Sequence, residues 1–173
     1  MKFKIPNAWR RLRRRPVLSL SIDVAVIVLV FLLIHSWNTR NLRQGVLPDL
    51  KLPALSASEI PETEGVGVIY FFAPWCFYCK NSIDNVEALV TEGRLDWARA
   101  VALEYDSKGA VQAFVDETGF RQPVLLGNGG VTREWGIQAF PTYFVVDSDG
   151  RISSRSVGYS TKAGLWLRAR LAE

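Results

Sequence analysis

The sequence is poor in the side chains that bind metals. Its 173 residues include only two cysteines, Cys76 and Cys79, one histidine and one methionine. The single histidine, His35, lies in or beside a long apolar segment, far before the cysteines. A structural zinc site uses four such ligands, so this short supply disfavours zinc and we expect no metal site. A purely structural disulfide stays an alternative, although so short a loop would constrain the unfolded chain little.

The sequence also lacks a glycine-rich phosphate-binding loop and internal repeats. Its net charge of +4 is unevenly distributed, because seven basic residues and no acidic residue lie in residues 1–16. The rest of the chain holds 14 basic and 17 acidic residues, with no basic stripe interleaved with aromatic side chains. We therefore expect no nucleic-acid partner.

Residues 17–34 form an apolar run interrupted by Ser19, Ser21 and Asp23. The run nearly spans a bilayer, and the basic tail predicts a cytoplasmic N-terminus by the positive-inside rule. A cleaved signal peptide is the alternative; against it, the run is long and no small-x-small cleavage site follows. We expect a single-pass inner-membrane protein with a periplasmic domain: a cytoplasmic tail at 1–16, a transmembrane anchor at 17–37, a tether and domain entry at 38–60, and the domain at 61–173.

The domain alternates strand and helix patterns. Residues 50–52 suggest a short edge strand, Gly119 and Thr161 suit helix caps, and Leu171 is expected to face the core. Strands are predicted at residues 66–72, 97–103, 123–126, 142–146 and 151–157, helices at 80–90, 108–118 and 161–171, and a single turn at 131–135. This order predicts an α/β fold in which helices flank a mixed central β-sheet.

Cys76 and Cys79 stand between the first of these strands and the helix at 80–90. A helix N-terminus carries partial positive charge and free backbone N–H groups, which favour a thiolate at the first cysteine. The second cysteine lies one turn further on and can close a disulfide. We therefore predict a redox pair in which Cys76 attacks and Cys79 resolves.

Two motifs together resemble the thioredoxin fold: Phe-Ala-Pro-Trp-Cys-Phe-Tyr-Cys-Lys at 72–80 and Ala-Phe-Pro-Thr-Tyr-Phe at 139–144. With the predicted anchor, residues 48–172 look like the TlpA/ResA/CcmG branch of envelope thiol–disulfide oxidoreductases. The resemblance implies that Pro141 is cis and faces the disulfide. It also implies that the backbone of Phe140 pairs with the substrate polypeptide.

The sequence departs from these relatives at two positions. Thioredoxins place a buried aspartate where this chain has Tyr70, and TlpA-like proteins often carry a glutamate where it has Ser82. Many relatives also carry an acid shortly after the next strand. By that resemblance Asp106 is the candidate proton relay for Cys79, with Glu104 second and a solvated loop acid as the alternative for both.

Four aromatic residues surround the motif and predict a hydrophobic docking collar for substrate protein: Trp75, Phe77, Tyr78 and Phe140. The resemblance implies a protein thiol–disulfide oxidoreductase that needs no cofactor besides its redox-active disulfide. We expect it to reduce envelope proteins and to be kept reduced by a membrane electron donor of the DsbD type. The alternatives are a cytochrome c maturation thioredoxin, a disulfide oxidase, and a non-catalytic binding module of the same fold.

Overall fold

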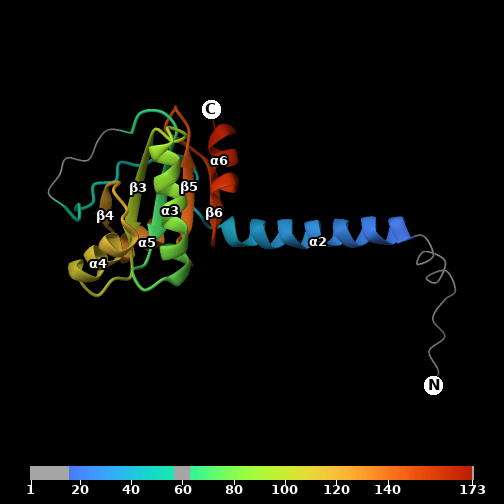
Figure 1. Ribbon diagram of the computed structural model, residues 1–173, viewed down its shortest axis with the longest axis horizontal. Helices are drawn as coiled ribbons and strands as arrows, with labels where there is room; N and C mark the ends of the chain where they lie inside the picture. Colours follow the sequence, from blue (N-terminus) through green and yellow to red (C-terminus); the bar gives the residue numbers. More distant parts are fainter. Residues whose placement is uncertain (1–15, 57–62, 173) are drawn as a thin grey trace, which may run out of the picture. The chain divides into compact units, whose positions relative to one another are not determined.

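The computed structural model describes residues 16–56 and 63–172 (Figure 1). The chain forms two compact units, one ending at Arg40 and the other beginning at Asn41. In the first unit, α2 (Pro16–Thr39) contains a stretch, Leu20–Thr39, that is long and apolar enough to cross a membrane. Signal sequences share this length and apolar composition. Of the predicted basic tail, residues 1–15 lie outside the described residues.

The second unit is built on a six-stranded mixed sheet in the order β1-β6-β5-β2-β3-β4. Strands β2, β3 and β4 run parallel, whereas β5 and β6 continue the sheet on the other side of β2 in antiparallel pairs. Strand β1 pairs antiparallel with β6 at the edge. The bounds are β1 (Gly45–Val46), β2 (Gly67–Phe72), β3 (Trp97–Ala102), β4 (Val124–Leu126), β5 (Thr142–Val146) and β6 (Arg151–Val157).

Four helices of this unit begin at polar or cysteine caps, as free backbone N–H groups require. Their caps are Cys76, Ser107, Asn128 and Thr161, each of which accepts from a backbone N–H of the first turn. The helices are α3 (Phe77–Thr91), α4 (Lys108–Thr118), α5 (Gly129–Trp135) and α6 (Lys162–Arg170). The predicted caps Thr161 and Gly119 are confirmed, Gly119 with a φ of 65°.

Strand β2 is buried along its whole length, and its side chains contribute to two hydrophobic cores. Its residues Val68, Tyr70 and Phe72 pack with α3, α4 and α6 on one face of the sheet. Ile69 and Phe71 pack on the other face, with α5 and the segment before residue 55. This is the mixed sheet flanked by helices that the sequence predicts (Figure 1).

The segment at residues 41–55 belongs to the second compact unit, within the stretch at 38–60 that the sequence assigned to a tether and domain entry. Leu42 is buried, and the Arg155 guanidinium donates to its carbonyl at 2.9 Å. The segment then reaches both sheet edges: Leu47 N donates to Gly150 O, and Leu55 N donates to Val124 O, each at 2.8 Å. Apolar side chains at positions that composition alone assigns to a linker explain this difference.

Two local predictions are wrong. Residues 50–52 do not form a strand; the edge strand is β1, five residues earlier, and the leucines at 50 and 52 pack against the core instead. Leu171 is 80% exposed, because it is the C-cap of α6 and the core contacts of that helix come from Leu165 and Ala169.

Candidate active site

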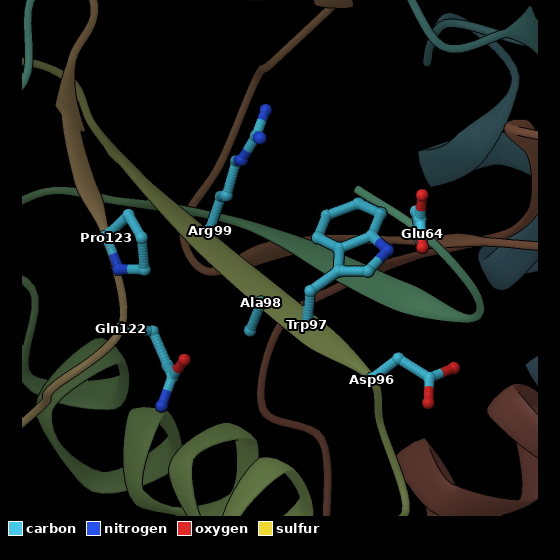
Figure 2. A pocket seen from close by; sticks show the side chains of 7 residues that line it. All are labelled: Glu64, Asp96, Trp97, Ala98, Arg99, Gln122 and Pro123. Atoms are coloured by element: carbon cyan, nitrogen blue, oxygen red, sulfur yellow. The ribbon is translucent and has the colours of Figure 1, made fainter. Parts of the chain in front are cut away.

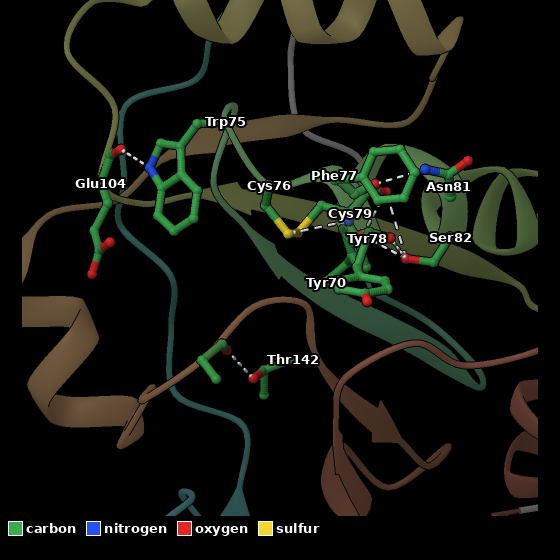
Figure 3. The surroundings of a disulfide bond; sticks show 11 residues. Tyr70, Trp75, Cys76, Phe77, Tyr78, Cys79, Asn81, Ser82, Glu104 and Thr142 are labelled. Atoms are coloured by element: carbon green, nitrogen blue, oxygen red, sulfur yellow. Dashed lines mark hydrogen bonds between the residues drawn. A yellow bond between two sulfur atoms is a disulfide. The ribbon is translucent and has the colours of Figure 1, made fainter.

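A disulfide joins Cys76 and Cys79 at the N-terminus of α3 (Figure 3). Cys76 is the N-cap, with extended backbone, and its sulfur accepts the N–H of Cys79 at 3.1 Å. The first turn of α3 carries no acidic residue. In the reduced protein the same N–H group and the helix dipole would therefore stabilise a thiolate on Cys76.

The two cysteines differ in their access to solvent. Cys76 is 5% exposed and lines a cavity of about 380 Å³, whereas Cys79 is fully buried and lies outside that lining. The roles assigned from the sequence, in which Cys76 attacks and Cys79 resolves, stay a prediction. The lining residues come from the α3 entry, the turn after β3 and the loop before β5: Trp75, Cys76, Phe77, Tyr78, Glu104, Gln138, Ala139 and Phe140.

The predicted aromatic collar surrounds this cavity. Trp75, Phe77 and Tyr78 are between 62% and 70% exposed, and Phe140 is partly buried. The rings of Trp75 and Phe140 meet edge to face with centroids 6.0 Å apart. The structure thus brings all four residues together with Cys76, although their contact with a substrate stays a prediction.

The peptide bond between Phe140 and Pro141 is cis, as the resemblance implies. Pro141 is buried and does not line the cavity, whereas Ala139 and Phe140 do. The Thr142 hydroxyl donates to the Ala139 carbonyl at 2.8 Å and ties the loop to the start of β5 (Figure 3).

On the buried side of the disulfide, the two departures from the relatives contact each other. The hydroxyl of Tyr70 donates to the carbonyl of Cys79 at 3.0 Å and lies 3.1 Å from the Ser82 hydroxyl (Figure 3). Both residues are fully buried. Burial strongly raises the pKa of Tyr70, so this hydroxyl stays neutral and serves as a donor.

The two candidate acids lie differently. Asp106 is exposed, in the turn between β3 and α4, and is not part of the cavity lining. Glu104 does line the cavity, and with a φ of 48° it is the single non-glycine residue of the described chain with positive φ. The Trp75 indole N–H donates to its carbonyl at 3.0 Å. The resemblance named Glu104 as the second candidate acid, but a glutamate gives no sequence signal for this backbone conformation.

The positively charged residue nearest to the two cysteines in sequence, Lys80, forms an ion pair. The Lys80 ammonium lies 2.6 Å from the Glu117 carboxylate of α4. Lys80 is therefore held in an ion pair with the neighbouring helix. We also find no group of three or more His, Cys, Asp or Glu side chains suited to a metal among residues 16–56 and 63–172.

A second cavity of about 320 Å³ lies where β3 begins, at the opposite end of that strand from the disulfide-bearing loop (Figure 2). Trp97 and Arg99 point to one side of β3 and Ala98 to the other. Asp96 at its rim accepts the backbone N–H of Val66 at 2.7 Å, a structural role. The cavity holds neither cysteine.

A comparison with known families decides the identity of the domain. The AhpC/TSA family profile matches residues 44–155. The chain belongs to the AhpC/TSA family. The AhpC/TSA match covers the sheet from the residue before β1 into β6 and includes both cysteines and the Phe140–Pro141 loop.

Curated relatives indicate which kind of AhpC/TSA-family protein this chain resembles. The thioredoxin-like protein YneN of Bacillus subtilis is 30% identical over 122 residues, which cover 66% of this chain and 71% of YneN. The thiol-disulfide oxidoreductase ResA of Bacillus thuringiensis is 28% identical over 110 residues, covering 62% of this chain and 64% of ResA. The match therefore spans less than two thirds of ResA.

A solved structure confirms the fold. The crystal structure of a thiol:disulfide interchange protein DsbE from Chlorobium tepidum superposes with a TM-score of 0.64 at 24% identity, covering 76% of this chain and 98% of that one. The predicted thioredoxin-like α/β fold is confirmed. With the relatives above, the cysteine pair places this AhpC/TSA-family chain among the thiol–disulfide oxidoreductases.

Proposed function

We propose that this protein is a membrane-anchored oxidoreductase that reduces disulfides of envelope proteins from the periplasmic side. One observation carries the proposal: a disulfide at a helix N-terminus opens into a cavity rimmed by exposed aromatic side chains. The anchor is α2, and the arginine-rich tail before it supports a cytoplasmic N-terminus. The disulfide then faces an oxidising compartment, where such exchange chemistry is needed.

The reaction moves two electrons from the reduced pair to a substrate disulfide. The Cys76 thiolate attacks one substrate sulfur, forms a mixed disulfide and releases the other substrate sulfur as a thiolate, which takes a proton from solvent. The Cys79 thiolate then attacks Cys76, closes the internal disulfide and releases the second substrate thiolate. The pair is its own redox centre, and we propose that a membrane dithiol donor of the DsbD type reduces it again.

The cavity suits a polypeptide chain better than a small molecule. Exposed aromatic side chains in its lining offer apolar contact, and the loop at Ala139–Phe140 also lines it. We propose that an extended, cysteine-bearing segment of the substrate lies between Trp75 and Phe140.

Trapping tests the proposal directly. Replacing Cys79 by Ala leaves Cys76 able to attack but removes the residue that releases the product, so substrate proteins should accumulate as mixed disulfides in the full-length, membrane-bound protein. The matched control carries Cys76→Ser as well as Cys79→Ala and should trap nothing. Absence of adducts in the single variant would show that Cys76 is not the nucleophile.

The trapped species and the redox state in cells separate the alternatives. Trapped apocytochrome would point to cytochrome c maturation, and a pair that is fully oxidised at steady state would point to an oxidase. Retained biological function after Cys76→Ser and Cys79→Ser together would point to a binding module. The reductase proposal needs a largely reduced pair and trapped envelope proteins of several kinds.

The proton relay is a separate part of the proposal. We keep Asp106 as the acceptor of the Cys79 proton and expect Asp106→Asn to slow release of a mixed disulfide, by up to about a hundredfold at neutral pH. Glu104→Gln is the matched control, since it removes one carboxylate from the cavity lining. A larger effect of the glutamate substitution in stopped-flow release would transfer the role to Glu104.

A further inference from the structure

Two buried tyrosines lie side by side beneath α3 but differ in what their hydroxyls contact. Tyr70 of β2 and Tyr143 of β5 pair in register, with ring centroids 5.0 Å apart. The Tyr70 hydroxyl bonds to the carbonyl of Cys79 and meets Ser82. Among the described residues, the buried Tyr143 hydroxyl has no hydrogen-bond partner. Burial raises the pKa of Tyr143, and the nearby Ser82 side chain and Ser160 backbone oppose that rise.

The contacts of Tyr70 tie the active-site turn to the central strand. The Cys79 carbonyl belongs to the first turn of α3, and the Ser82 hydroxyl donates to the carbonyl of Tyr78 in the same turn at 2.7 Å. Tyr70 itself is fixed in β2, which pairs with strands on both sides. The backbone of the resolving cysteine is therefore held by a side chain from a central strand of the sheet.

We propose that Tyr70 is a positioning residue for Cys79, with Ser82 as its partner. This inference rests on the proposed function. When the disulfide is open, the bond from Tyr70 holds the backbone of Cys79 where its sulfur can reach Cys76, so that ring closure stays an intramolecular reaction between aligned groups. Tyr70 touches no reacting atom; it acts through the placement of Cys79.

The arrangement predicts that loss of the Tyr70 hydroxyl weakens closure of the disulfide. Tyr70→Phe should lower the equilibrium constant for closing the Cys76–Cys79 disulfide against glutathione about fivefold, roughly the worth of one hydrogen bond. That change equals a reduction potential about 20 mV more oxidising. Release of a substrate from a mixed disulfide on Cys76 should slow by a similar factor.

Tyr143→Phe is the matched control. It removes the same atom from a neighbouring, equally buried ring whose hydroxyl lies near Ser82 but does not bond to the Cys79 carbonyl. Both variants are measured in the full-length protein in detergent micelles, by glutathione titration, by the rate of mixed-disulfide release and by thermal unfolding. A general packing role would change the melting temperature in both variants; a positioning role changes the potential and the release rate in Tyr70→Phe alone.

Equal potentials for the two variants and the native protein would overturn the positioning role. If Tyr70→Phe does not fold, Ser82→Ala decides, because it removes the second tie to the turn: a change of about twofold in the closure constant supports the proposal, and an unchanged constant overturns it. Failure of the native protein to exchange with glutathione at all would instead refute the proposed function.

Discussion

Adjacent residues of β2 supply two aromatic clusters with different tasks, one on each face of the sheet. Phe71, Phe144 and Trp135 pack together with ring centroids between 4.9 and 5.5 Å apart, on the face covered by α5. On the α3 face, Tyr70 lies between Phe72 and Tyr143 at centroid distances of 6.1 and 5.0 Å.

The two aromatic clusters differ in their hydroxyl groups. The cluster around Trp135 contributes packing. The cluster on the α3 side of the sheet also makes hydrogen bonds that reach the first turn of the active-site helix. One strand thus stabilises the domain with its odd-numbered side chains and shapes the redox site with its even-numbered ones. Changes on the first face should alter stability, and changes on the second should alter chemistry.

The strongest effect on chemistry is expected at the disulfide itself. Cys76→Ser removes the attacking sulfur and should lower the rate of disulfide reduction at least about a thousandfold, because the one remaining cysteine, Cys79, is fully buried and lies outside the cavity lining. The measurement is turnover of a model disulfide by the pre-reduced protein. Under reducing conditions its unfolding free energy should match that of the native protein; persistent turnover would contradict the assignment.

The largest effect on stability is expected on the opposite face. Trp135 is fully buried, so Trp135→Ala should cost about 3–5 kcal/mol of unfolding free energy, as measured by denaturant titration. Leu171→Ala, at an exposed position, is the control and should change it by less than about 0.5 kcal/mol. A reduction potential altered by Trp135→Ala in the folded protein would break the division between the two faces.

The buried tyrosines predict a loss of stability at high pH. Burial raises the pKa of both Tyr70 and Tyr143 above the unfolded value of about 10, so their contribution is present below pH 10 and is lost as the pH rises further. Between its unfolded and its folded pKa, each tyrosine costs at most about 1.4 kcal/mol of unfolding free energy per pH unit.

Phenylalanine substitutions test this slope. Tyr70→Phe and Tyr143→Phe should each reduce the pH dependence of unfolding above pH 10 by about the same amount, since each removes one raised pKa. Unfolding curves at several alkaline pH values give the slope. A slope that is the same in the native protein and in both variants would show that these hydroxyls ionise without unfolding.

The smallest effect is expected at the surface of the α3 face. Glu117→Gln breaks the ion pair with Lys80, whose two side chains are 61% and 33% exposed, and should cost less than about 1 kcal/mol of unfolding free energy. The freed ammonium then stands next to Cys79 in the sequence. In 0.5 M salt, the native protein and the variant should have the same unfolding free energy, because salt screens the ion pair. A difference in unfolding free energy that persists in salt would contradict this explanation.

Periodicity was enough to locate most of the domain. Strands β5 and β6 and helix α4 have the bounds that the sequence predicts, because alternating apolar residues and caps such as Gly119 mark their ends. Helix α5 is longer than the single turn expected, since Asn128 acts as its N-cap within a stretch that resembles a glycine turn. The two motifs also identified the disulfide, the collar and the cis peptide bond.

Contacts between residues far apart in the chain could not be predicted from the sequence. Residues 41–55 look like a linker because their partners, β4 and β6, lie some 70 to 110 positions further on. Tyr70 and Ser82 could be recognised as departures from relatives, but their contact with each other depends on how α3 lies on β2. Glu104 was predicted only as the second candidate acid, and its positive φ and the hydrogen bond that its carbonyl accepts from Trp75 had no sequence signal.

The segment at residues 45–55 touches both edges of the sheet, and this has a consequence for biosynthesis. It leaves the ribosome before any strand that it pairs with: β4 begins at Val124 and β6 at Arg151. At about 5–20 residues per second, β6 follows β1 by roughly 5–20 s. During that interval the growing sheet has unpaired edges, which are the parts of a sheet that join other chains. The first-made segment of the domain is therefore one of the last to find its place.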